Sequence, residues 1–215
     1  MQDLFGERAE QVKILGTSTP VLPLPTDPNE PIQYTEKTEK IVFKRASQSY
    51  GSYLYNYVFN GLLADNTELK NGDMVYREKD NGTYFIVARR HGAFSEIGKL
   101  IKANSEICIV RKVTKYVNHT KVGAENKVIA TCLANFRVIN GNMYAYEDNL
   151  LPTSMVKFIV GIDKNIRLGD KIYFKEDYDA GDTERVFTVD FLDNETNTGA
   201  LTIQCTIDTG NKKTV

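Results

Sequence analysis

The sequence predicts an all-β protein built from small β-barrel or sandwich modules, with a short N-terminal helix and an extended proline-rich arm. Three observations predict this class. After residue 38, most of the chain consists of short runs in which apolar and polar residues alternate, as in strands with one buried face. Turn signals rich in Gly, Asn and Asp separate these runs. A Gly-Asp unit followed by a hairpin pattern also occurs twice.

The alternating runs number about ten to twelve, which is the strand density expected of a barrel or sandwich. The Asn-Gly signal in residues 80–83 ("DNGT") lies between two such runs and predicts a hairpin. The turn "DNETNTG" does the same near the C-terminus. The clearest runs are residues 39–46, 104–117, 155–162, 185–192 and 199–207.

The repeated unit spans residues 69–87 ("LKNGDMVYREKDNGTYFIV") and 166–189 ("IRLGDKIYFKEDYDAGDTERVFTV"). Gly72 and Gly169 are predicted to supply a bend that a residue with a Cβ would resist. Asp73 and Asp170 are predicted to bond their own downstream backbone and fix the turn. Two copies indicate two stacked β modules or one sheet system with pseudo-repetition.

The N-terminal region differs from the rest. Leu4, Phe5, Ala9, Val12 and Leu15 recur at near-helical spacing, which predicts a short helix within residues 1–16.

A proline-rich segment follows this predicted helix. Five of the six prolines lie between Pro20 and Pro31, so this stretch is predicted to be extended. Val21, Leu22 and Leu24 are interleaved with the prolines. They favour an arm that packs on a neighbouring subunit, while a disordered linker is the alternative.

We therefore divide the chain into residues 1–38 (helix and proline-rich arm), 39–110 (first β module) and 111–215 (second, barrel-like module). Cys108 and Cys205 fall inside apolar strand-like runs and are expected to be free buried thiols, as in a reducing cytoplasm.

Composition and motifs argue against catalysis. The formal net charge of -1 gives no global attraction to nucleic acid or membrane. No apolar run approaches the roughly 20 residues of a membrane-spanning helix, and the N-terminus does not resemble a signal peptide. His91 and His119 lack metal-ligand spacing, and residues 177–184 resemble a calcium loop without its distal glutamate. We expect no enzyme activity, no cofactor and no metal.

Basic residues concentrate locally within residues 99–121. We interpret residues 111–127 as a long polar loop in which Lys112, Lys115 and Lys121 face a channel and touch phosphates. A plain subunit contact is the alternative. The other long polar loop, residues 175–184, is acidic and would repel DNA.

Four segments carry a family resemblance: residues 60–76 ("NGLLADNTELKNGDMVY"), 83–90 ("TYFIVARR"), 98–110 ("GKLIKANSEICIV") and the late block 160–210. Their order resembles that of bacteriophage head-tail joining, or head-closure (stopper-like), neck proteins. The resemblance covers roughly three quarters of the chain and rests on Gly-Asp turns in apolar frames.

The resemblance implies a non-enzymatic virion protein, synthesised in the host cytoplasm, that closes the portal channel and provides a tail attachment platform. The implied partners are further copies in a ring of about six or twelve, the portal or adaptor protein, tail proteins and, transiently, packaged DNA, with no membrane. Another phage structural role, such as a tail terminator, a baseplate hub or a capsid-associated protein, stays open. An enzyme or ligand-binding module is the weakest alternative.

Overall fold

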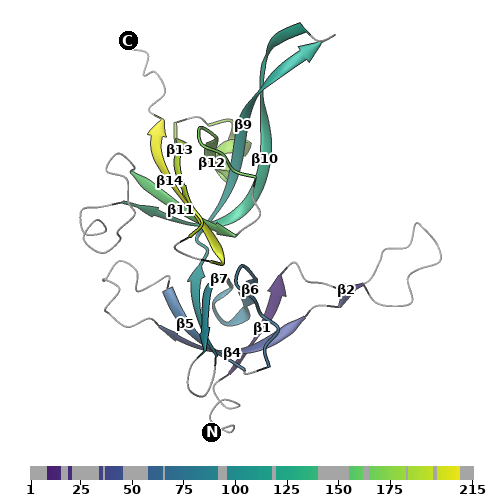
Figure 1. The fold of residues 1–215 in the computed structure, drawn as a ribbon, viewed down its shortest axis with the longest axis vertical. Helices are drawn as coiled ribbons and strands as arrows, with labels where there is room; N and C mark the ends of the chain where they lie inside the picture. Colours follow the sequence, from purple (N-terminus) through teal and green to yellow (C-terminus); the bar gives the residue numbers. More distant parts are fainter. Residues whose placement is uncertain are drawn as a thin grey trace, which may run out of the picture. The chain divides into compact units, whose positions relative to one another are not determined.

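The computed structural model divides the chain into two compact units, Met1–Ala103 and Asn104–Val215. Each unit contains a closed antiparallel barrel of six strands, named barrel 1 and barrel 2 here (Figure 1). This confirms the predicted all-β class. The residues that the structure describes are 9–15, 19–20, 34–35, 37–45, 58–64, 66–91, 96–117, 120–139, 155–161, 165–182, 184–195 and 198–208.

Barrel 1 is an antiparallel barrel with the order β1-β4-β5-β8-β7-β6. A short 3-10 helix, Glu78–Asp80, lies in the β6–β7 hairpin, and Asn81 follows it in the left-handed conformation, so the predicted "DNGT" hairpin is confirmed. The strands of barrel 1 are β1 (Glu10–Leu15), β4 (Thr38–Arg45), β5 (Val58–Leu63), β6 (Met74–Arg77), β7 (Gly82–His91) and β8 (Glu96–Lys102).

Barrel 2 has the order β10-β11-β14-β13-β12-β9. Its β12–β13 connection contains a short helix, α3 (Lys175–Ala180), and its β13–β14 hairpin is the predicted C-terminal pair. The strands of barrel 2 are β9 (Ser105–Val117), β10 (Thr120–Val138), β11 (Val156–Gly161), β12 (Lys171–Phe174), β13 (Val186–Asp193) and β14 (Ala200–Asp208).

The two barrels repeat one topology. Strands β9 to β14 take the places of β1 and β4 to β8 in chain order. The register repeats as well, because the residue after each Gly-Asp pair faces the first strand of its barrel: Met74 lies opposite Leu15, and Lys171 lies opposite Val110. The chain therefore contains one barrel design twice, which explains why the Gly-Asp unit recurs.

Strand β1 replaces the predicted N-terminal helix, so that prediction is wrong for residues 10–15. Val12 and Ile14 alternate with more exposed neighbours and are 1% and 8% exposed, a period of two that fits a strand as well as the spacing fitted a helix. Strand β1 pairs with both β4 and β6 and closes barrel 1. Tertiary pairing thus overrides a weak local preference.

The domain boundaries also differ from those predicted. The units meet between Ala103 and Asn104 rather than at residue 110, because the first half of β9 already pairs with β10 and β12. Residues 1–38 are not a separate segment. Strands β2 (Thr19–Pro20) and β3 (Tyr34–Thr35) pair with each other within the β1–β4 connection, and the proline-rich residues 21–33 between them lie outside the described residues.

Each barrel closes over clustered aromatic rings, whose centroids lie 5.1 to 6.3 Å apart within a barrel. Such tilted and edge-on contacts add to the burial of apolar area. The rings are Phe43, Phe59 and Tyr84 in barrel 1, and Phe136, Phe158, Phe174 and Phe187 in barrel 2.

The barrels differ in how one layer of the core is filled. In barrel 1, Gly61 lies opposite Gly98, and a Cβ on Gly61 would come within 2.5 Å of Leu100 Cδ1. The corresponding pair in barrel 2 is Phe158 opposite Ile203. Barrel 1 therefore packs neighbouring side chains over bare backbone where barrel 2 inserts side chains of its own.

The Gly-Asp turns are built alike. Gly72 N donates to Ile86 O at 2.8 Å, and Ile86 N donates to Asp73 O at 2.9 Å. In barrel 2, Gly169 and Asp170 make the same two bonds to Val189, at 2.9 and 3.0 Å. The φ angles of Gly72 and Gly169 are 97° and 82°, as the predicted bend requires.

The aspartate carboxylates act differently from the prediction. Asp73 Oδ2 accepts from Lys70 N at 2.7 Å, and Asp170 Oδ2 accepts from Arg167 N at 2.8 Å. Each carboxylate thus holds the residue three positions before it, not the downstream backbone. Each aspartate side chain therefore satisfies a backbone N–H inside its own turn, before the following strand begins.

The positive φ angles predict a conformational cost of substitution. We expect Gly169→Ala, and likewise Gly72→Ala, to lower the free energy of unfolding of its own barrel by roughly 1–2 kcal/mol. A Cβ on Gly169 meets nothing within 4 Å, so the loss reports conformation rather than a clash. Hydrogen exchange resolved by barrel measures it. Gly161→Ala, also in open space and without a positive φ, is the control; equal effects at both positions would contradict the assignment.

An ion pair between β1 and β6 predicts acid sensitivity of barrel 1. Arg77 Nε and Nη2 donate to Glu10 Oε2 and Oε1 at 2.6 and 2.8 Å. These two hydrogen bonds are the largest cause of the lowered pKa of Glu10, which falls below 4.5. The pair therefore stabilises the barrel above the unfolded pKa, and its contribution is lost as pH falls through the lower folded pKa.

We expect Glu10→Gln to destabilise barrel 1 at pH 7 and to make the difference from wild type shrink toward pH 3, in denaturation curves recorded over this range. A difference that is constant with pH would show that the pair does not act through ionisation.

Candidate functional site

The feature that departs most from a closed barrel is the hairpin formed by β9 and β10. These strands pair with each other continuously, apart from two bulges, up to Val117 opposite Thr120. Strand β12 pairs with β9 over Ile107–Val110, and β11 pairs with β10 over Asn135–Val138. Residues 111–117 and 120–127, called the ribbon here, continue past the barrel as two strands, roughly 20 Å long, and project away from it (Figure 1).

The outer edges of the ribbon are open. Within the described ranges, no third strand pairs with residues 111–117 or 120–127. An open edge leaves backbone donors and acceptors free to pair with another chain. Such edges are normally short or covered unless they serve in binding.

The ribbon exposes apolar side chains together with charge. Tyr116, Val117 and Val122 are 63%, 49% and 55% exposed. Lys112 lies opposite Asn126, and Lys115 lies opposite Gly123, so these two lysines point to opposite faces. Lys115 also lies 3.9 Å from the Glu125 carboxylate.

Two of the predicted loops are corrected by this geometry. Residues 111–127 are not a loop but the ribbon, because β-branched alternation continues past the barrel rim. Residues 175–184 are not wholly a loop either, since α3 occupies Lys175–Ala180 and ends at Gly181 in the left-handed conformation. The structure separates Lys112 from Lys115 by face and places Lys121 opposite Tyr116 in register. A channel-facing role for these lysines stays a prediction.

The base of the ribbon is fastened to the second Gly-Asp turn. Arg111 Nε and Nη2 donate to the two carboxylate oxygens of Asp170, both at 2.7 Å, and Nη2 also donates to Asn165 O at 2.6 Å. Asp170 is 3% exposed. The hydrogen bonds that Arg111 donates to the Asp170 carboxylate raise the pKa of the Arg111 guanidinium above its usual value. Arg111, expected as part of a basic loop, is thus a structural anchor; its position next to an apolar run gave no sign of this.

The β12–β13 connection carries the opposite charge. Residues 175–185, called the acidic segment here, hold five carboxylates and two basic residues. Asp177 is buried and accepts from Arg185 at 2.7 Å, and Asp179 pairs with Lys175. Glu176, Asp179 and Glu184 are exposed. The acidic residues predicted as a long polar loop therefore form a surface around a helical turn.

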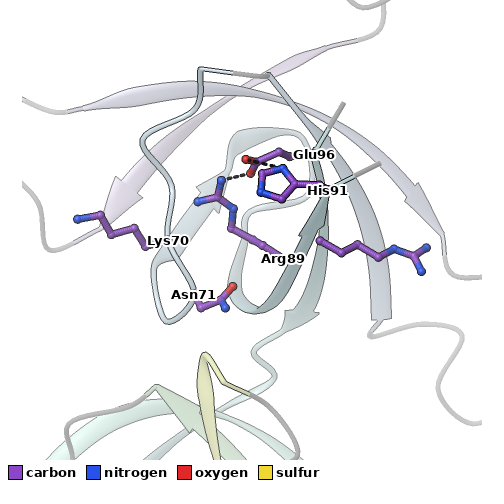
Figure 2. Close-up of a pocket in the computed structure, with 6 residues that line it drawn as sticks. Lys70, Asn71, Arg89, His91 and Glu96 are labelled. Carbon is purple, nitrogen blue, oxygen red and sulfur yellow. Dashed lines mark hydrogen bonds and ion pairs between the residues drawn. The ribbon is translucent and has the colours of Figure 1, made fainter. Parts of the chain in front are cut away.

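A polar hollow of about 340 Å³ lies beside the first Gly-Asp turn (Figure 2). Arg89 donates to Leu69 O and to Glu96, while His91 Nδ1 lies 3.4 Å from Glu96 Oε1. Arg89 thereby fastens the residues before the first turn to the start of β8, whereas Arg111 fastens the second turn to β9. The lining residues are Lys70, Asn71, Arg89, Arg90, His91 and Glu96, which include no hydroxyl or thiol nucleophile for His91 to activate.

Other predicted site residues have these outcomes. Among the described residues, no group of three or more His, Cys, Asp or Glu side chains is placed to hold a metal ion. Cys108 and Cys205 are free and buried, as predicted, and burial raises the pKa of the Cys205 thiol. Val21, Leu22, Leu24 and His119 lie outside the described residues.

Comparisons of the chain with protein families, curated proteins and solved structures find no match. In the part of the chain that the structure describes, no helix has the length and apolar character to cross a membrane.

The Arg111 anchor predicts unequal roles for the two equivalent aspartates. Asp170→Ala leaves the largely buried Arg111 guanidinium, whose side chain is 16% exposed, without its carboxylate. We expect the free energy of unfolding of barrel 2 to fall by about 2–4 kcal/mol. Asp73→Ala removes the matching turn bond in barrel 1 and should cost about 1 kcal/mol. Chemical denaturation measures both.

A second variant isolates the stranded charge. Arg111→Leu combined with Asp170→Ala should be more stable than Asp170→Ala alone, because the uncompensated guanidinium is gone. If the double variant is the less stable of the two, the anchor is not an ion pair in the sense described.

Proposed function

We propose that the chain is a structural virion protein of a tailed bacteriophage, which forms a ring in the head-tail neck that closes the portal channel and provides the tail attachment platform. The observation that supports an assembly role is the ribbon: a two-stranded hairpin with two open edges that exposes Tyr116, Val117 and Val122 beyond a closed barrel. Open strand edges and exposed apolar side chains are features of surfaces that bind other chains.

The rest of barrel 2 suits a rigid support for such a contact. Its core is closed around clustered aromatic rings, and Arg111 fastens the ribbon to a buried aspartate at its base. A projecting element on a rigid base loses little conformational freedom on binding, which favours affinity.

The station within the virion rests on the family resemblance of residues 60–110 and 160–210. Those segments form the Gly-Asp turns and the β8–β9 junction of the two barrels, so the resembling residues belong to the repeated barrel design. Small barrels of this kind serve in several virion parts. A tail terminator, a baseplate hub or a capsid-associated protein is therefore the second candidate.

The proposed partners are further copies of the chain in a ring of about six or twelve, the portal or adaptor protein, and tail proteins, with packaged DNA as a transient contact. The proposed location is the virion neck. The proline-rich β1–β4 connection, with Val21, Leu22 and Leu24, is proposed to pack on an adjacent subunit. No catalytic step and no cofactor form part of the proposal.

Labelled particles test the function. We expect an antibody against an affinity tag at the C-terminus to mark the neck of purified particles in electron micrographs, with few copies per particle. In particles made with residues 21–33 replaced by a short Gly-Ser linker, we expect filled heads that lack the ring and do not join tails.

The controls separate location from folding. The linker variant, purified alone, should keep the melting behaviour of wild type, because β2 and β3 contribute no strand to the barrel. If the label instead lies along the tail, at the baseplate or over the capsid, the neck assignment is wrong and the second candidate, another structural role in the virion, takes its place. Normal tail joining by the linker variant would remove the role of the proline-rich connection.

A further inference from the structure

The ribbon and the acidic segment carry complementary charge on one chain. Residues 111–127 contain five basic residues and one carboxylate, and residues 175–185 contain five carboxylates and two basic residues. Arg111 is engaged by Asp170, which leaves Lys112, Lys115 and Lys127 as the described, exposed cations of the ribbon. Glu176 and Glu184 are their exposed counterparts on the acidic segment, together with Asp179, which is exposed and also pairs with Lys175.

These two surfaces cannot meet within one barrel. Phe174, directly before α3, pairs with Ile107 of β9. Lys127, which lies opposite Arg111, and Lys112 are four and five residues further along this register, and Lys115 is eight residues further. These lysines therefore lie about 13 to 26 Å along the strand from the base of α3. Strand pairing keeps the ribbon extended away from its barrel, so its lysines do not reach the acidic segment of the same chain.

The side chains of the ribbon suit a protein surface better than nucleic acid. Lys112 and Lys115 point to opposite faces, so they do not form one row along a phosphate backbone. Glu125 lies among them, 3.9 Å from Lys115, and would repel phosphates. Exposed Tyr116, Val117 and Val122 add apolar area, which a protein partner buries and a phosphate backbone does not.

We propose that the ribbon of one copy docks on the acidic segment of a second copy, head to tail. Lys115 and Lys127, which share one face of the ribbon, face Glu176, Asp179 and Glu184 of the neighbour, and Val117 on the same face packs beside these pairs. Lys112 adds positive charge from the opposite face. Because the two contacting surfaces differ, the contact is heterologous, and repeating it generates a ring when the rotation closes. This inference rests on the proposed function, since it names the contact that would build the proposed ring.

Charge reversal tests the pairing. The ribbon variant carries Lys112→Glu, Lys115→Glu and Lys127→Glu; the segment variant carries Glu176→Lys, Asp179→Lys and Glu184→Lys. We expect sedimentation equilibrium of the full chain to show self-association weakened about tenfold or more in each variant. Wild-type association should also weaken as salt rises, because exposed charges are screened.

Recovery of self-association is the decisive measurement. Mixing the two variants should restore assembly, because the negative ribbon of one then meets the positive segment of the other. A chain with all six substitutions should also self-associate, since its charges are exchanged rather than lost. The matched control, Lys40→Glu with Lys44→Glu and Lys70→Glu, reverses three exposed lysines of barrel 1 and should leave association unchanged.

Three results would overturn the inference. The first would be a wild-type chain that stays monomeric at high concentration. The second would be a ribbon variant that associates like wild type. The third would be that neither the mixture nor the variant with all six substitutions recovers association, although all variants keep the wild-type melting curve. Loss of binding to a labelled DNA duplex by the ribbon variant, with association intact, would identify nucleic acid as the partner instead. In that case, a neck label on particles would still support the proposed function, whereas its absence would reject the function itself.

Discussion

In each barrel, a Gly-Asp turn is tied by two backbone hydrogen bonds to a single residue of the strand that it faces: Ile86 in barrel 1 and Val189 in barrel 2. Directly after that residue the register of the facing strand shifts, between Ile86 and Ala88 and between Val189 and Phe191. A bulge bends a strand and increases its twist, which a six-stranded sheet needs in order to close. The turn and the bulge together therefore set where each barrel curves.

On this common frame the two barrels differ where they reach outward. Both barrels place an insertion between their first and second strands: residues 16–37, which include the proline-rich segment, between β1 and β4, and the ribbon at the junction of β9 and β10. The first is rich in proline, which has no N–H to donate, and the second consists of paired strands with open outer edges. The same position in the design thus carries two chemically distinct insertions.

Alternation and turn chemistry predicted most of the strands, both Gly-Asp turns and the buried thiols. Strand β1 escaped because Val12 and Leu15 also match a helical period, and its identity depends on pairing with residues far along the chain. The role of Arg111 escaped for the same reason, since Asp170 is distant in sequence and meets it through the β9–β12 pairing. The ribbon exists because the alternating pattern of β9 and β10 continues past the rim of the barrel. The sequence does not show where that rim lies, since the rim depends on pairing with β11 and β12. Local patterns thus specified the elements, whereas long-range register decided the site.

The internal position of the proline-rich segment has a consequence for processing of the chain. Strand β1 is hydrogen-bonded on one side to β4 and on the other to β6, and Arg77 grips Glu10 through two hydrogen bonds. A protease that cuts between β2 and β3 therefore breaks the backbone without releasing the N-terminal fragment, because β1 stays bound in the barrel non-covalently. The nicked protein would migrate as two fragments after denaturation and as one species before it.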